Sequence, residues 1–234
     1  MYSKTAQKVL DFYGGEALWK KAQKLEATVS VKGLAFTLKR RPFFVNVLLE
    51  MDLDKPFCSI TPIGKDKNIK GILRNQDVYL ENDKKEILAE RKNGRKYFPY
   101  GRRLFWWDDL DMAYFANYAF WNYFSFPRLL MREDIAWKEK EAGVLEAIFP
   151  DTIPSHCRVQ EFYFDKESGQ LLEHHYTANI ISKLAKVVHT VGEHENKHGL
   201  RYAKHRIVRP RDRKGKAMKG PVMIDISVHD MKLS

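Results

Sequence analysis

The chain has 234 residues, of which 44% are hydrophobic and 30% are charged. This is the composition of an ordinary globular protein; it excludes wholesale disorder, and a chain of this length can bury a core without disulfides or metal ions. Most of the net charge of +11 lies in residues 201–220, which hold nine basic side chains and one acidic one, Asp212. Because the rest of the chain is nearly balanced, a nucleic-acid-binding surface that covers the whole domain is not expected.

The first residues of the chain contain no apolar stretch followed by a small-residue cleavage site, so no secretory signal is predicted. No run of about 18 apolar residues predicts a membrane span either. We therefore expect a cytoplasmic protein. In that compartment the two cysteines, Cys58 and Cys157, are expected to be small buried hydrophobic side chains, with a disulfide or a catalytic thiol as the alternative.

Residues 5–24 are predicted to be helical with an interruption at Gly14-Gly15, because a glycine pair ends one helix and lets another begin. From residue 25 onward, alternating apolar and polar side chains predict short strands separated by turn residues. In the first half of the chain they are predicted at 27–32, 34–39, 44–53, 57–61, 71–73, 78–81 and 87–91. In the second half they are predicted at 135–140, 144–149, 156–165, 170–180, 185–191, 200–209 and 222–231. Short strands with close turns indicate a large antiparallel sheet, and no linker divides the chain, so we expect one domain over 1–234.

Residues 106–126 contain a third of the aromatic side chains of the protein. Asp108, Asp109 and Asp111 suit the N-terminus of a helix, where free N–H groups and the helix dipole favour negative charge, and Pro127 marks its end. Apolar side chains lie on all sides of the helical projection, which predicts a buried helix. It can act as a plug that fills the sheet or as the wall of a ligand pocket. Its tyrosine and tryptophan side chains favour the wall, because each carries a polar atom that needs a partner when buried.

Two patterns suggest catalytic or metal-binding chemistry. The stretch His194-Glu195-Asn196-Lys197-His198 matches H-E-x-x-H, but this motif needs a helix, and here it lies between two strand-like runs; we interpret it as a coincidence and expect no metal site. The hairpin around Gly169 places Glu161 opposite His174 in the simplest register, and a one-residue slip reverses the faces. The candidate acid–base residues are His156, His174 and Tyr176. The alternative is that they are hydrogen-bonded polar side chains on a half-exposed sheet.

The basic segment near the C-terminus is predicted to be a strand end followed by a flexible loop. It is either a solvated hairpin tip or a contact for an anionic membrane surface. Aromatic residues do not alternate with the basic ones, so nucleic acid is not favoured. The candidate contact residues are Arg206, Arg209, Arg211, Arg213, Lys214 and Lys216.

The segment Trp107-Asp108-Asp109-Leu110-Asp111 and the ten residues 114–123 resemble a family of bacterial proteins without an assigned activity, whose pattern is roughly W-D-D-L-D…Y-F-x-x-Y-A-x-W-N-Y. That family is similar in architecture to the LolA/LolB-type lipoprotein carriers, half-open antiparallel barrels that hold lipid chains against a lid of helices. The resemblance implies a mainly β fold (α+β by element count). It is expected to be a large curved antiparallel sheet or half-open barrel with an N-terminal helix and a central aromatic helix as plug or lid. Further matches are Gly14-Gly15 with Trp19, Phe149-Pro150, His156, Gln160, Phe162-Tyr163-Phe164-Asp165, His174 and Tyr176-Thr177-Ala178.

The sequence departs from the expected pattern at His175, where an acid is expected, and at residues 203–206, where Pro-Thr-Arg-Arg is expected. The LolA/LolB-type carriers are exported, whereas no export signal is predicted for this chain. We expect the chain to bind a lipid or another apolar small molecule between the sheet and the aromatic helix, without catalysis and without a cofactor. The alternatives are an enzyme for a small hydrophobic substrate and an interaction module that uses residues 201–220. The candidate ligand-binding residues are Trp107, Tyr114, Phe115, Tyr118, Trp121, Asn122, Tyr123, Phe126, Gln160 and Tyr163.

Overall fold

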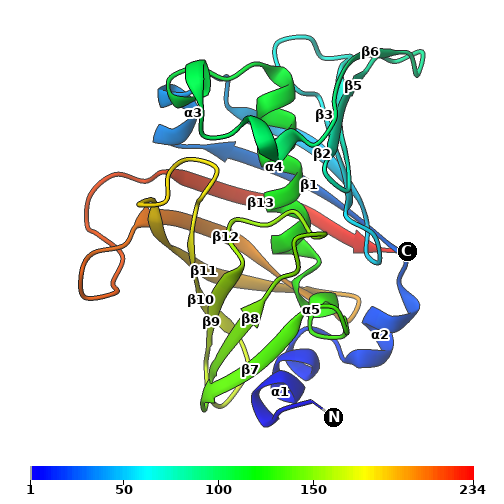
Figure 1. Cartoon of the computed structure of the whole chain (residues 1–234). Coiled ribbons are helices and arrows are strands. Elements are labelled where there is room, and N and C mark those ends of the chain that lie inside the picture. Colours follow the sequence, from blue (N-terminus) through cyan, green and yellow to red (C-terminus); the bar gives the residue numbers. More distant parts are fainter. Residues whose placement is uncertain (1) are drawn as a thin grey trace.

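The computed structural model describes residues 2–234, which form one antiparallel sheet of thirteen strands (Figure 1). The strands of the first half are β1 (Lys24–Lys32), β2 (Phe44–Asp52), β3 (Phe57–Thr61), β4 (Lys70–Arg74), β5 (Asp77–Glu81) and β6 (Ile87–Arg91). Those of the second half are β7 (Ala136–Glu141), β8 (Val144–Ile148), β9 (Val159–Phe164), β10 (Leu171–Thr177), β11 (Lys186–Lys197), β12 (Leu200–Pro210) and β13 (Ile224–Leu233). The mainly β fold predicted from the sequence is confirmed.

Two meanders make up this sheet. Strands β1 to β6 lie side by side in chain order, and so do β7 to β13; the two sets are joined where β1 pairs with β13. The sheet ends at β6 and β7, which do not pair with each other, so it is open. It curves around the central helix α4 (Asp109–Phe124), while α1 (Lys4–Phe12) and α2 (Glu16–Lys21) lie beside α5 (Phe126–Leu129) at one end (Figure 1). The break at Gly14-Gly15 separates α1 from α2, as predicted.

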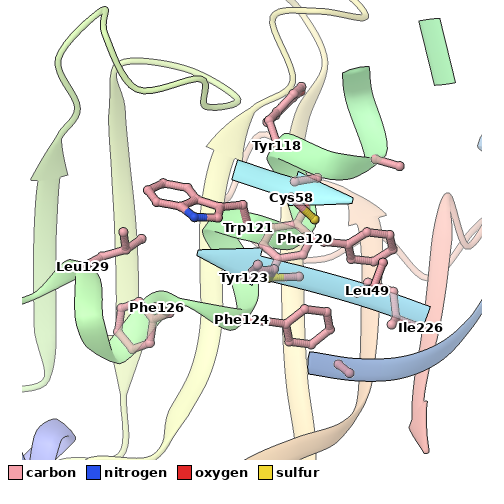
Figure 2. Packing of buried hydrophobic residues seen from close by; sticks show 14 of the residues in the cluster. Leu49, Cys58, Tyr118, Phe120, Trp121, Tyr123, Phe124, Phe126, Leu129 and Ile226 are labelled. Carbon is pink, nitrogen blue, oxygen red and sulfur yellow. The ribbon is translucent and has the colours of Figure 1, made fainter. Parts of the chain in front are cut away.

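Helix α4 is the centre of the hydrophobic core. Fourteen of its 16 residues are buried, and it contacts β3, β4 and β5. Figure 2 shows Phe120, Trp121 and Phe124 of this helix among Leu49 of β2, Cys58 of β3 and Ile226 of β13. The prediction of a helix that is buried nearly all round is therefore confirmed. Both cysteines are free, with Cys58 buried and Cys157 half-buried.

Charged groups fix the start of α4. Asp108 is the N-cap: its side chain accepts a hydrogen bond from the Asp111 amide (2.7 Å), and the Asp111 carboxylate accepts one from the Asp108 amide (3.2 Å). Asp111 is fully buried and binds Arg91 (2.5 Å), Arg102 (2.9 Å) and Arg103 (2.6 Å). Burial alone would raise the pKa of Asp108, but hydrogen bonds from Arg91 and from the Asp111 amide hold it at about 2.

The structure differs from the sequence prediction at residues 34–39, which were expected to form a strand. They contain helix α3 (Leu34–Leu38) instead. The chain leaves β1 at Gly33, whose φ of +135° is rarely adopted by other residues, and the Leu34 amide then bonds to the carbonyl of Val222 (3.0 Å). An apolar alternation of five residues is too short to distinguish a strand from one helical turn, and here Phe36 points inward while Leu38 is exposed.

The connection between the two meanders also contains two short 3-10 helices, η1 (Gly94–Tyr97) and η2 (Gly101–Leu104). Within residues 2–234, no helix is long and apolar enough to cross a membrane.

Candidate ligand-binding pocket

An apolar pocket of about 110 Å³ lies between one face of α4 and the concave face of the sheet. Helix α4 contributes Met112, Phe115, Ala116, Ala119, Phe120 and Tyr123 to its wall. The sheet contributes Val31, Phe44, Val187, Val208 and Ile226. The opposite end of the pocket is lined by Ala35 of α3, Ile181, Ala185 and Met223, which are only half-buried, so this end faces outward.

Three polar side chains meet at the inner end of the pocket. The hydroxyl group of Tyr123 lies 2.8 Å from Nε2 of His156 and 2.6 Å from the hydroxyl group of Tyr176. The His156 and Tyr176 rings stack with their centroids 4.0 Å apart, and Tyr118 completes the group with its hydroxyl 3.1 Å from Nδ1 of His156. All four side chains are buried. They form a connected hydrogen-bond network at the end of the wall. Lys39 also lines the pocket, and its ammonium group donates to the carbonyls of Arg103 (3.0 Å) and Leu104 (2.7 Å).

This network is uncharged at neutral pH. Burial lowers the pKa of His156 to about 3, and the positive charge of Arg95 adds to the effect. Burial raises the pKa values of Tyr118, Tyr123 and Tyr176 above their usual value of 10.0. At pH 7 the network therefore offers neutral hydrogen-bond donors and acceptors.

The register of the β9–β10 hairpin decides which histidine faces the interior. A bulge between Leu171 and Glu173 places Phe162 opposite His174 and leaves Glu161 opposite His175, one residue away from the simplest register. His174 then stacks on Phe162 (4.1 Å between centroids), and its Nε2 lies 2.7 Å from Oε1 of Gln160. The three candidate acid–base residues, His156, His174 and Tyr176, thus come together in the interior, but Glu161 is not the partner of His174.

The structure places three of the ten candidate ligand-binding residues on the pocket wall: Trp107, Phe115 and Tyr123. Tyr118 is connected to it through His156, which lines the pocket, whereas Gln160 contacts His174, which lies beside Tyr123 but not on the wall. The others have different surroundings. Tyr114 donates a hydrogen bond to Gln76 (2.7 Å) beside a separate polar cleft. Trp121 donates to the Asp52 carbonyl (2.7 Å), and Asn122 donates to the Pro154 carbonyl (2.8 Å). Phe126 stacks on Phe162, and Tyr163 lies on the outer face of the sheet, where it donates to Glu161.

The small side chains that create the space were not singled out from the sequence. Ala116 and Ala119 leave room beside α4, and Val208 and Ile226 form the floor opposite them. Alanines in a helix and aliphatic residues in a strand have no distinctive spacing, so only the three-dimensional pairing of the strands reveals them as pocket residues.

The other candidate motifs lie apart from the pocket. His194 is in strand β11 rather than a helix and contacts the hydroxyl group of Tyr13 (2.9 Å), while His198 is exposed. Residues 2–234 contain no group of three or more His, Cys, Asp or Glu side chains that could hold a metal ion.

The candidate basic residues of the C-terminal segment also lie apart from the pocket. Four of them lie in or beside the loop after β12: Arg211, Arg213, Lys214 and Lys216. Arg209, near the end of β12, donates to the Gly220 carbonyl (2.8 Å). Arg206 differs from them because its side chain is only 5% exposed and faces the interior.

No protein-family model and no curated protein sequence matches the chain. Solved structures do. A LolA superfamily protein from Nitrosomonas europaea matches with a TM-score of 0.52 and 11% identity, over 99% of this chain and 94% of that one. A putative outer membrane lipoprotein-sorting protein domain from Vibrio parahaemolyticus matches with a TM-score of 0.50 and 13% identity, over 98% and 93%.

The chain has a LolA-like fold. At these identities the likeness is one of fold, and it confirms the expected similarity in architecture to the LolA/LolB-type carriers. In this LolA-like fold the pocket lies on the concave side of the open sheet, against the aromatic helix α4.

Proposed function

We propose that the protein binds a lipid chain or another apolar small molecule in the pocket between the sheet and α4, without catalysing a reaction. The observation that carries this proposal is the pocket itself: its wall is almost wholly apolar, and apart from Lys39 its polar side chains, Tyr123, His156 and Tyr176, meet at the inner end. Ligand sites combine apolar walls with a few placed polar groups in this way. The LolA-like fold supports the proposal, because one matched protein is described as a putative outer membrane lipoprotein-sorting protein.

Filling the pocket tests this proposal. Ala119 lines the pocket, so Ala119→Phe should place an aromatic ring in the space that the ligand would occupy. We expect the wild-type protein to bind the neutral apolar dye N-phenyl-1-naphthylamine with increased fluorescence, and Ala119→Phe to reduce the affinity at least about 10-fold, a loss of about 1.4 kcal/mol. The control is Ala142→Phe in the exposed turn between β7 and β8, which should bind as the wild type does.

Thermal unfolding of each variant establishes that it is folded. Equal binding by the wild type and Ala119→Phe, or no binding by the wild type, would contradict the proposal. Mass spectrometry of a solvent extract of the purified protein then identifies any molecule that remains bound.

An enzyme for a small hydrophobic substrate is the second candidate, because His156, His174 and Tyr176 converge in the interior. Against it, general acid–base catalysis works best with a pKa near the working pH, whereas the pKa of His156 is about 3 and that of Tyr176 is well above 10.0. Conversion of the extracted molecule during incubation, lost in His156→Gln, would favour the enzyme. Release of the unchanged molecule favours a binding protein.

We further propose that an anionic membrane surface is the partner at the outer end of the pocket. Exposed apolar side chains of Leu34, Leu38, Leu184 and Met218 lie on α3 and on the loops after β10 and β12. These segments adjoin one another. The Arg211 amide bonds to the Lys186 carbonyl (2.9 Å), and the first amides of α3 bond to the carbonyls of residues 222 and 223. Figure 1 shows the three segments on one side of the sheet. The loop after β12 also carries Arg213, Lys214 and Lys216, and basic residues beside apolar ones favour binding to anionic lipid. The cytoplasmic location remains a prediction, which cell fractionation tests.

A further inference from the structure

Arg206 is a buried cation without an acidic partner. Its side chain is 5% exposed, and among residues 2–234 no Asp or Glu forms an ion pair with it. Nε has no hydrogen-bond partner, one Nη donates only a long bond (3.4 Å) to the Tyr123 carbonyl, and the guanidinium lies 5.4 Å from the centroid of Phe124. Burial of an unpaired charge costs several kcal/mol. A fold that keeps such a group requires something else to compensate it.

His189 is a second unpartnered polar group next to it. It is fully buried, and neither ring nitrogen has a hydrogen-bond partner. Its ring lies 4.4 Å from that of Tyr123 and 5.9 Å from that of His174. Burial, and then the positive charge of Arg206, lower the pKa of His189 well below 6.5, so the ring is neutral and still holds one N–H to donate.

The strand register places both groups directly beyond the pocket floor. Arg206 pairs with Ile226, and His189 pairs with Val208; Ile226 and Val208 both line the pocket. Paired residues of antiparallel strands point to the same face, so Arg206 and His189 face inward beside that floor. Tyr123 stands between the two regions, because it lines the pocket and also a small cavity of about 10 Å³ beside Arg206. That cavity has room for about one water molecule.

We propose that the ligand of the pocket is an amphiphile with a single carboxylate, which enters with its acidic end first and pairs with Arg206 and His189. This inference rests on the proposed binding function. A guanidinium fork matches the geometry of a carboxylate, the neutral imidazole supplies a further N–H, and Tyr123 is the side chain that lines both the pocket and the small cavity beside Arg206. The apolar wall receives the first part of the chain. An engineered cavity of about 150 Å³ holds benzene, so a pocket of about 110 Å³ accommodates a short stretch of chain, and the remainder extends through the outer end.

A matched pair of ligands separates the carboxylate from the chain. Octanoate and 1-octanol have the same number of carbons and differ in the acidic group, and their binding to the full chain is measured by isothermal titration calorimetry at pH 7.5. We expect octanoate to bind about 10- to 100-fold more tightly than 1-octanol, because its carboxylate forms a charge-assisted hydrogen bond with Arg206 that adds to the binding free energy. In Arg206→Met this preference should disappear through loss of octanoate affinity, with the affinity for 1-octanol unchanged.

Arg206→Met is expected to fold, because it exchanges an unpaired buried charge for an apolar side chain of similar length. Its melting temperature should be at least that of the wild type, and His189→Leu, which removes the second donor, should weaken octanoate binding in the same direction. The control is Arg213→Met in the exposed loop.

Equal affinities for the two ligands in the wild type would overturn the carboxylate inference and leave the proposed function standing. Binding of neither ligand would overturn both. A preference for octanoate that persists in Arg206→Met would show that the carboxylate pairs elsewhere.

Discussion

Buried histidines give individual residues of this interior a pH dependence. His156, His174 and His189 are each at most 3% exposed; burial is the main reason that the pKa of His156 falls to about 3 and that the other two fall well below 6.5. Unfolding releases these side chains into water, where their pKa returns to about 6.5. Below that pH the unfolded chain binds more protons than the folded one, so the stabilising effect is present at pH 7 and is lost as the pH falls from about 6.5 towards 3.

We therefore expect the free energy of unfolding to decrease steeply between pH 6 and pH 4, by about 1.4 kcal/mol per pH unit for each histidine that stays neutral in the fold. His189→Leu should reduce this slope, because His189 has no hydrogen bond to lose and leucine cannot take up a proton. The measurement is urea unfolding at pH 7, 6, 5 and 4. His198→Asn at an exposed position is the control, and a slope unchanged in His189→Leu would show that His189 does not contribute.

Tyr123 was a candidate ligand-binding residue and His156 and Tyr176 were candidate acid–base residues from the sequence, because each is a polar side chain in an aromatic or strand-like context. Arg206 was grouped with the exposed basic residues of the C-terminal segment. The reason is physical: Arg206 lies on a strand whose faces alternate, and only the pairing with Ile226 shows which face is inside. A basic residue among other basic residues carries no local sign of burial.

At the scale of elements, the N-terminus of α4 depends on one buried carboxylate. Asp111 is fully buried and contacts three arginines, so Asp111→Asn leaves a group of positive charges without compensation. We expect a loss of about 3–5 kcal/mol in the free energy of unfolding, measured by urea denaturation. The control, Asp134→Asn, breaks the exposed pair with Arg132 and should cost at most about 1 kcal/mol. Equal losses would mean that the Asp111 cluster is no more important than a surface ion pair.

The elements that the sequence predicted best are those with a local signal. The acidic start of α4, its uniform burial and the helix break at Gly14-Gly15 all follow from side chains within a few residues of one another. The strand predicted at 34–39 was wrong because it depends on distant partners, and the register of the β9–β10 hairpin stayed open between two alternatives. Helix α3 is held by carbonyls of residues 222 and 223, and the bulge after Leu171 shifts by one residue the pairs that lie beyond it in the hairpin.

At the scale of the whole molecule, the sequence predicted a large antiparallel sheet but could not predict how its halves meet. The pairing of β1 with β13 joins residues more than 190 positions apart, and no turn residue signals it. This pairing brings Val31 beside Ile226 and so closes the floor of the pocket. The pocket therefore follows from long-range topology, although the helix that covers it was evident from composition.

The outer end of the pocket is where the whole molecule is expected to meet a membrane. The loop after β12 is basic, and charge reversal there should weaken binding to vesicles that contain anionic lipid. We expect Arg213→Glu with Lys214→Glu to reduce the partition coefficient onto phosphatidylserine vesicles at least about 10-fold, since each basic residue near such a surface contributes about 1 kcal/mol. Co-sedimentation at 50 and 300 mM salt measures this, and wild-type binding should fall with salt because the attraction is screened.

The matched control, Lys84→Glu with Lys85→Glu, makes the same change of charge in the exposed turn between β5 and β6, at one edge of the sheet. If both double variants lose binding equally, net charge rather than this loop governs the attraction, and a wild-type response that does not change with salt would exclude an electrostatic contact with the membrane altogether.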